Sequence, residues 1–342
     1  MKQAVLTQKE TILFSEIEKP VISETEVLIK VKYIGICGSD IHAYYGKHPF
    51  ISFPIRLGHE MSGEILETGN AVKNFHRGDL VTIMPQQFCG HCEPCRSGRY
   101  NICETLKVIG CQLPGAACEY FKAEASVLKK IPEGMSARIA ATIEPAAVGV
   151  HAVRRCGSIK GKNVVVIGAG TIGNVTAQAA LAEGAKDVLI TDLSDYRLGL
   201  AKDCGIIHTV NTGRISMEKA VEQAFAGKGA DIFLECVGLG DTLNQAIACS
   251  KRGCDIVVVG VYGYEPQLTM SWVQKRELRI TGSQMYVERD FQDAIDYIEA
   301  SKMKMEPLIS KIFSFEKYGE AYKYIEKNRD ISLKILIKMQ DG

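Results

Sequence analysis

The densest chemical feature of this sequence is a cluster of four cysteines. They follow the spacing C-x2-C-x2-C-x7-C and are Cys89, Cys92, Cys95 and Cys103. Four thiolates at this spacing can surround one tetrahedral Zn²⁺. Because the protein would then supply all four ligands, the spacing predicts a closed, structural zinc site. An iron–sulfur cluster, which also takes four thiolates, and plain reduced cysteines are the alternatives.

A second group of candidate ligands is spread over the first half of the chain. It comprises Cys37 in GICGSD, His59 and Glu60 in LGHE, and Glu144 in IEP. A thiolate, an imidazole and a carboxylate can hold Zn²⁺ and still leave a coordination position for substrate or water. Residues this far apart in sequence are more often structural, so their types alone leave the metal assignment open.

Gly168, Gly170 and Gly173 form the pattern G-x-G-x-x-G. The apolar run NVVVIGAG precedes the pattern, and TIGNVTAQAALAEG follows it, so it lies between a predicted strand and a predicted helix. This context provides a tight turn, close approach of the backbone to a pyrophosphate, and a helix N-terminus with exposed N–H groups. We therefore predict a dinucleotide site, with Thr171 and Ile172 opening the helix.

Asp192 closes the next predicted strand, 19 residues after Gly173. A carboxylate there accepts hydrogen bonds from ribose hydroxyls and repels a 2′-phosphate, which favours NAD over NADP. Arg197 could stack on the adenine or bind a phosphate, and the alternative for Asp192 is that it only caps the following helix. The ends of the later predicted strands add further candidate cofactor-binding residues, namely Cys236, Val237, Val259, Gly260 and Ser283.

Two kinds of sequence pattern must position these residues. Residues 1–145 hold short β-like runs separated by Gly and Pro, which predicts an irregular β-rich domain with long loops. From Lys162 onward, strands and helices alternate, which predicts a doubly wound parallel sheet whose sixth strand covers 277–283. The last apolar run, SLKILIKM, has no partner in a complete six-stranded sheet, so we expect it to return to the first domain. The predicted division is 1–145 plus 285–342 for one domain and 146–284 for the other.

Composition limits the range of partners. The formal net charge is +1, which indicates neither a nucleic-acid nor a membrane partner. The apolar runs are too short to cross a bilayer, and the first ten residues do not resemble a signal peptide. We therefore expect a cytoplasmic protein whose 12 cysteines stay reduced.

The motifs GICGSDIH, LGHE, the four-cysteine loop, IEP and GAGTIG occur in the order seen in zinc-containing medium-chain alcohol dehydrogenases. The chain resembles this family along nearly its whole length, closest to its sorbitol dehydrogenase-like and hexonate 5-dehydrogenase branch. The resemblance implies an α/β fold with a GroES-like β-rich catalytic domain and a Rossmann NAD domain. It also implies two zincs per chain, one of them catalytic and bound by Cys37 and His59. Glu60 and Glu144 would supply or exchange the remaining protein ligand.

The same resemblance implies catalytic roles around the second zinc. A zinc with an open position polarises a substrate hydroxyl, and NAD takes the hydride from its carbon. Ser39 and His42 match the family's proton relay, although His42 is alternatively an ordinary surface histidine. Asp40 matches the carboxylate that orients His59. Glu60 stands both among the metal ligands and among the catalytic residues.

The substrate is less well defined by these motifs. Sorbitol-type enzymes have a Tyr where this chain has Ala43 and an Arg where Met285 aligns, so we expect a sugar acid or related polyol, such as a hexonate. Lys47, His48 and Arg56 could bind its carboxylate, unless Arg56 is paired within the fold. The alternatives are a threonine dehydrogenase-like enzyme and a catalytically silent nucleotide-binding protein. The intact ligand set disfavours the silent protein, and the resemblance implies a homodimer or homotetramer.

Overall fold

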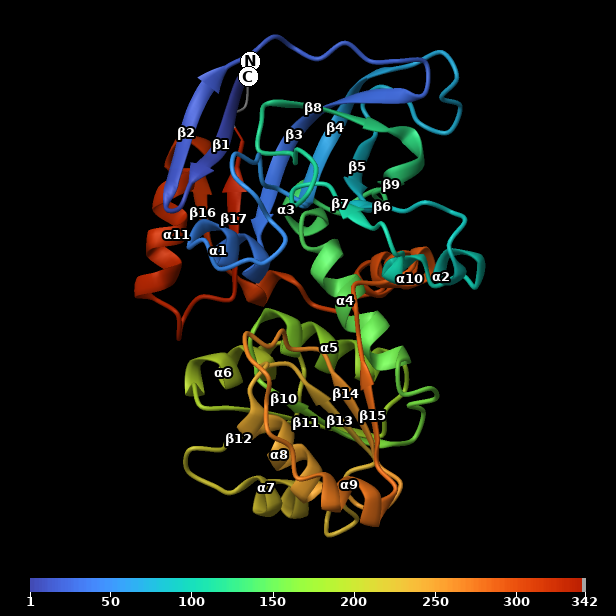
Figure 1. Ribbon diagram of the computed structural model, residues 1–342, viewed down its shortest axis with the longest axis vertical. Helices are drawn as coiled ribbons and strands as arrows, with labels where there is room; N and C mark the ends of the chain where they lie inside the picture. The colour runs from blue at the N-terminus through green and yellow to red at the C-terminus, as the bar shows by residue number, and fades with distance from the viewer. Residues whose placement is uncertain (340–342) are drawn as a thin grey trace. The chain divides into compact units, whose positions relative to one another are not determined.

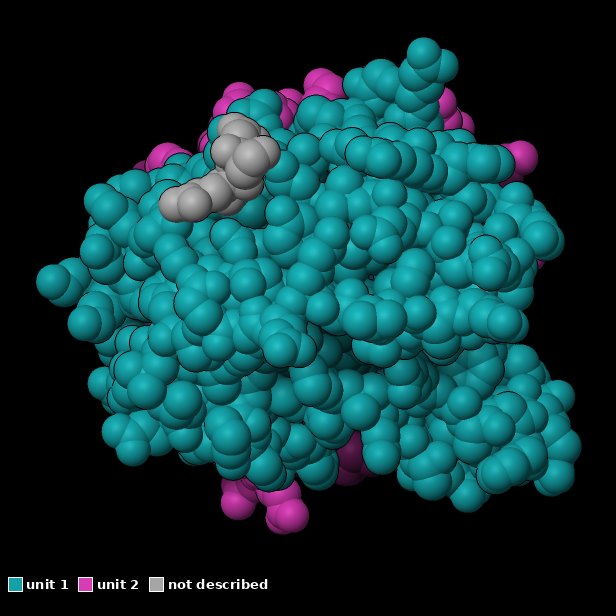
Figure 2. Space-filling model, turned by 90° about the horizontal axis from the view of Figure 1, so that it is seen from above, with its two compact units in different colours: residues 1–144, 309–342 teal, residues 145–308 magenta. Residues whose placement is uncertain are grey.

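The computed structural model describes residues 1–339 of the chain. It divides into two compact units, marked by colour in Figure 2. Unit 1 contains Met1–Glu144 together with the segment that starts at Ile309, and unit 2 contains Pro145–Leu308. Among the described residues, every helix is too short or too polar to serve as a membrane span.

Unit 2 is built on a parallel sheet with helices between its strands. Within the described residues the sheet has six strands in the order β12-β11-β10-β13-β14-β15. Its strands are β10 (Asn163–Ile167), β11 (Asp187–Asp192), β12 (His208–Asn211), β13 (Ile232–Glu235), β14 (Asp255–Val258) and β15 (Arg279–Gly282). The helices are α4 (Ile143–Arg154), α5 (Thr171–Ala182), α6 (Asp195–Asp203), α7 (Met217–Ala224), α8 (Gly240–Cys249), α9 (Met270–Arg276), α10 (Glu288–Glu299) and the 3₁₀ turn η3 (Glu306–Leu308).

This strand order reverses between β10 and β13, as in the predicted doubly wound fold. Every residue of β10 is buried, which explains why its sequence is an unbroken apolar run rather than an alternating one. The predicted sixth strand is present as β15 at one edge of the sheet.

Unit 1 is β-rich and takes its last elements from the C-terminal part of the chain. Its elements are β1 (Lys2–Gln8), β2 (Thr11–Glu16), β3 (Glu26–Ile36), α1 (Gly38–Tyr44), β4 (Glu60–Thr68), β5 (Leu80–Ile83), β6 (Gln86–Gln87), α2 (Glu93–Arg96), η1 (Tyr100–Ile102), β7 (Lys107–Val108), β8 (Tyr120–Glu124), η2 (Ala125–Val127), β9 (Leu128–Lys130), α3 (Ala137–Ala140), β16 (Ile309–Ser314), η4 (Phe315–Lys317), α11 (Tyr318–Lys327) and β17 (Lys334–Lys338). Its main sheet has the order β16-β17-β3-β4-β5-β9, and β8 also pairs with β3.

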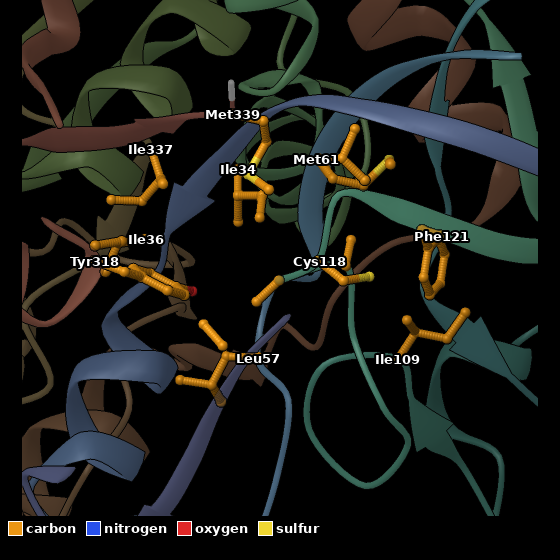
Figure 3. Packing of buried hydrophobic residues seen from close by; sticks show 14 of the residues in the cluster. Ile34, Ile36, Leu57, Met61, Ile109, Cys118, Phe121, Tyr318, Ile337 and Met339 are labelled. Carbon is orange, nitrogen blue, oxygen red and sulfur yellow. The ribbon is translucent and has the colours of Figure 1, made fainter. Parts of the chain in front are cut away.

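The final strand returns to the first domain, as expected. β17 runs antiparallel to β3, with Ile335 opposite Ile36 and Leu336 opposite Gly35, and Figure 1 shows red β17 near blue β3. The two strands share one hydrophobic core with β4. Figure 3 shows Ile34 of β3, Met61 of β4 and Ile337 of β17 among its packed side chains, and all three are fully buried.

The structure divides the chain at a different point from the predicted residue 285. Helix α10 belongs to unit 2 because Arg154 of α4 bonds Asp290 at 2.8 Å and Asp293 at 2.6 Å. His151 Nδ1 lies 2.6 Å from the Asp290 carboxylate as well. The amphipathic pattern of α10 predicts a helix but not the unit against which it packs. Residues 340–342 of the predicted range lie outside the described residues.

Candidate active site

Cys37, His59 and Glu60 meet at the end of the β3–β4 pair. Cys37 directly follows β3 and is the N-cap of α1, while His59 directly precedes β4. The antiparallel register places Glu60 opposite Gly35, so the three residues converge although they are far apart in sequence. Their ligand atoms all lie within 4.8 Å of one another. A thiolate, an imidazole and a carboxylate fit the three-ligand sites of catalytic zinc.

Asp40 of α1 holds this group in position. Its Oδ2 accepts a hydrogen bond from the backbone N–H of Cys37 at 2.9 Å, and its Oδ1 lies 3.4 Å from His59 Nδ1. Burial by itself would lower the pKa of His59, but the Asp40 carboxylate raises it well above its usual value. A carboxylate at Nδ1 leaves Nε2 of a metal-binding histidine for the ion, which is the role expected of Asp40.

A buried cation lies next to Glu60 and was not predicted from the sequence. Lys334, the first residue of β17, places its ammonium 2.7 and 2.6 Å from the two Glu60 oxygens and 3.2 Å from the carbonyl of Ile36. Lys334 is 3% exposed and Glu60 1%. Gly35 makes room for the pair, since a Cβ at this position would lie 2.1 Å from Glu60 Oε2. The one sequence feature that could have indicated a buried cation is the lysine inside the apolar run SLKILIKM.

Glu144 is buried near the start of α4, yet its carboxylate is outside the group formed by Cys37, His59 and Glu60. Burial disfavours a charged Lys334, but nearby negative groups, first Glu60, then Cys37 and last Glu144, raise the pKa of Lys334. Of the two candidate glutamates, Glu60 is the one whose carboxylate lies close to Cys37 and His59, and which of them binds the metal stays a prediction. An exchange between them stays a prediction.

The relay and substrate candidates lie on α1 and in the loop that follows it. Ser39 is half-buried and His42 is exposed, which fits an inner and an outer position in a proton relay. His48 Nδ1 accepts a hydrogen bond from Phe50 N at 3.2 Å, and burial, followed by His42, lowers the pKa of His48. Arg56 is paired within the fold, because it donates to Gly115 O at 2.6 Å and to Gln3 Oε1 at 2.9 Å.

The four cysteines of the predicted structural site come together as expected from their spacing. Their sulfur atoms lie within 4.8 Å of one another in the loop that contains α2 and η1. The backbone N–H of Cys89 lowers the pKa of the Cys103 thiol to about 6, and those of His91 and Cys92 lower the pKa of Cys89. Burial raises the pKa of Cys95 to about 12, so this thiol would lose its proton on binding the ion. The convergence of the four sulfur atoms fits a closed zinc site.

We expect the main effect of Cys95→Ser to be a loss of stability. Losing one of four ligands should release the structural zinc, lower the zinc content by one per chain, and lower the thermal midpoint by about 5–10 °C. Metal analysis and thermal unfolding measure both effects. The control is Cys156→Ser, since this half-buried thiol in unit 2 lies outside both ligand groups. A Cys95→Ser protein with its full zinc content and an unchanged midpoint would exclude a structural zinc here.

The glycine motif forms the predicted turn between β10 and α5. Gly168 has a φ of +96°, which L-residues with side chains rarely adopt. Gly170 is the N-cap of α5, so the first N–H groups of this helix are available to an anion. At Gly173, a Cβ would lie 1.7 Å from Gly168 O, so the helix can approach the turn only with glycine.

Asp192 ends β11 and binds this turn. Its Oδ2 accepts a hydrogen bond from Ala169 N at 2.7 Å, and its Oδ1 accepts one from Ser194 N at 2.8 Å. The N-cap of α6 is Ser194, whose hydroxyl accepts from Arg197 N, so the alternative that Asp192 only caps this helix is wrong. The Arg197 guanidinium lies 3.9 Å from Asp192. The remaining cofactor candidates, Cys236, Val237, Val259, Gly260 and Ser283, follow β13, β14 and β15 at the same carboxyl edge.

Both units match known protein families. Residues 23–133 match the alcohol dehydrogenase GroES-like domain, and residues 171–300 match the zinc-binding dehydrogenase domain. The chain belongs to the zinc-containing medium-chain alcohol dehydrogenases, as its motifs predicted.

Individual relatives cover nearly the whole chain. It is 35% identical to a sorbitol dehydrogenase of Halalkalibacterium halodurans, over 97% of this chain and 98% of that protein. It is 31% identical to the L-galactonate-5-dehydrogenase of Escherichia coli, over 97% of both. The crystal structure of an Escherichia coli alcohol dehydrogenase complexed with NADH has a TM-score of 0.91, 29% identity and 99% coverage of both chains.

Proposed function

We propose that this enzyme oxidises a secondary hydroxyl of a sugar acid or polyol, such as a hexonate, to a ketone with NAD. The observation that carries the proposal is the convergence of Cys37, His59 and Glu60 within 4.8 Å. It occurs in a chain that also has a dinucleotide turn closed by Asp192. Relatives named sorbitol dehydrogenase and L-galactonate-5-dehydrogenase support this substrate class.

The chain's own residues supply positioning and proton transfer. When bound, zinc polarises the substrate hydroxyl and NAD accepts the hydride. Asp40 Oδ1 lies 3.4 Å from His59 Nδ1, where it would orient the ring. Ser39 offers a hydroxyl on α1, and His42, exposed on the same helix, passes the proton to water. Asp192 supports NAD over NADP, since a 2′-phosphate would meet its carboxylate.

The side chains after α1 favour an acidic substrate over plain sorbitol. Arg56 is occupied by Gly115 and Gln3, which leaves Lys47 and His48 as the candidates for a substrate carboxylate. His48 keeps Nδ1 as an acceptor for Phe50 N, so its neutral ring presents Nε2–H as a donor. Lys47 is exposed and carries the positive charge.

We expect the zinc-loaded enzyme to reduce NAD with hexonates such as L-galactonate, L-gulonate and L-idonate. The kcat/KM should exceed that for ethanol by at least about tenfold, because polar substrate groups gain donors at Lys47 and His48. The kcat/KM with NAD should exceed that with NADP by a similar factor. The assay follows NADH formation with each substrate, with sorbitol and L-threonine alongside. Turnover of L-threonine alone would favour the amino-alcohol alternative and contradict this proposal.

We also propose a homo-oligomer in a reducing compartment such as the cytoplasm. β15 lies at the edge of the unit 2 sheet, where a two-fold axis could pair it with a second copy. All twelve cysteines are free thiols, which suits a reducing environment.

A further inference from the structure

Glu235, at the carboxyl end of β13, is a fully buried carboxylate that the proposed chemistry does not use. Its Oε1 accepts hydrogen bonds from Val237 N at 2.9 Å, from Gly238 N at 3.0 Å and from the hydroxyl of Thr242 at 2.8 Å. Its Oε2 accepts from the hydroxyl of Tyr262 at 2.9 Å. Burying a carboxylate costs free energy unless it is hydrogen-bonded. These four donors supply the hydrogen bonds that compensate for the burial of Glu235.

The four donors are neutral, and they come from two different loops and from helix α8. Val237 and Gly238 belong to the loop after β13, and Tyr262 belongs to the loop after β14. Thr242 lies in the first turn of α8, whose N-terminus also favours a nearby negative charge. Burial, followed by the Glu235 carboxylate, raises the pKa of Tyr262, so its hydroxyl keeps the proton that it donates. Glu235 therefore ties the two loops together through one hydroxyl.

These loops pack closely against each other and against the turn after β10. Gly238 has a φ of +83°, and a Cβ on it would lie 2.4 Å from Val261 O. A Cβ on Gly260 would lie 2.2 Å from Gly238 N, and one on Gly168 would lie 2.7 Å from a methyl group of Val237. The turn after β10 and the loops after β13 and β14 thus interlock at the carboxyl edge of the sheet.

The strand order assigns these loops to one half of the dinucleotide. In a doubly wound sheet, the first three strands form one mononucleotide site and the last three form the other. β10 and β11 carry the glycine turn and Asp192, which serve the adenosine and pyrophosphate. The loops after β13 and β14 then serve the nicotinamide half.

We propose that Glu235 and Tyr262 act as a clamp that holds the loops after β13 and β14 in shape for the nicotinamide half of NAD. Tyr262 is a positioning residue: it acts through Glu235 and the backbone of Val237 and Gly238. Pre-forming a binding loop removes an ordering cost from each binding event. The inference rests on the proposed use of NAD.

The test is Tyr262→Phe in the zinc-loaded, full-length enzyme, with NADH and ADP titrated separately by fluorescence or calorimetry. Tyr262→Phe removes one hydrogen bond to a charged group and keeps the ring. We expect the Kd for NADH to rise about tenfold and the Kd for ADP to change less than about twofold. ADP probes the glycine turn and Asp192 alone.

Tyr297→Phe is the matched control. The Tyr297 hydroxyl also donates to a carboxylate, Glu183, at 2.9 Å in unit 2, but it lies on α10, away from the loops after β13 and β14. Tyr297→Phe should leave the Kd for NADH and the Kd for ADP within about twofold of the wild-type values. An unchanged Kd for NADH in Tyr262→Phe, or equal weakening of NADH and ADP, would overturn the clamp. A wild-type enzyme that binds no NADH would refute the proposed function instead.

Discussion

Cys37→Ser should abolish turnover while the fold stays intact. Serine keeps the backbone N–H that Asp40 accepts, so α1 should still start at the same place. It removes the thiolate from the group with His59 and Glu60, and a neutral hydroxyl is a poor zinc ligand. We expect kcat/KM to fall by at least about a hundredfold, the upper range for losing a residue that merely supports a ligand.

Metal analysis and thermal unfolding separate this variant from one in the four-cysteine loop. Cys37→Ser should retain the structural zinc and unfold within a few degrees of the wild type. Cys95→Ser should lose the structural zinc and unfold at a clearly lower temperature. NADH binding should persist in Cys37→Ser, because its expected ligands lie in unit 2. If Cys37→Ser turned over at the wild-type rate, the catalytic zinc would have to be assigned elsewhere.

Lys334→Met should destabilise unit 1 strongly when the zinc has been removed. Methionine fills much of the space of the lysine stem but leaves the carboxylate of Glu60 buried without its cation. Breaking a buried ion pair on one side costs about 3–5 kcal/mol. In the zinc-loaded enzyme the loss should be smaller, since the ion's own charge faces the same carboxylate. Denaturant unfolding with and without a chelator measures the difference.

Lys338→Met provides the control for this experiment. Lys338 is the last residue of the same strand and is exposed, so the same substitution there should change the free energy of unfolding by less than about 0.5 kcal/mol. Adding Glu60→Gln to Lys334→Met should recover part of the lost stability in the metal-free protein. Equal losses for Lys334→Met and Lys338→Met would show that the pair contributes nothing to unit 1.

Local sequence patterns predicted the structure correctly where a feature is formed by one continuous segment. The glycine turn at 168–173 lies between β10 and α5 because an apolar strand and a helix flank it. The spacing of the four cysteines alone predicted that their sulfurs meet. Even the pairing of the last strand with the first domain followed from counting strands in the parallel sheet.

Features that join distant segments were missed. Lys334 and Glu60 are separated by 274 positions, and no local periodicity relates them. The predicted end of the second domain, at residue 284, differs from the end of unit 2 at Leu308. The ion pair that holds α10 joins Arg154 and Asp290, which lie far apart in sequence, so no local pattern shows it. The sequence analysis gave Asp192 as the alternative cap of α6 and did not consider Ser194, which is the N-cap in the structure.

The path of the chain through the two units also bears on its synthesis. Unit 2 is continuous, so all of its residues have been synthesised before the strand that carries Lys334 is made. Domains fold as their residues emerge. The nucleotide unit can therefore be complete while Glu60 still awaits its buried cation, and the metal-binding half matures last. A nascent chain stalled before β17 would hold every predicted zinc ligand and still lack the partner of one of them.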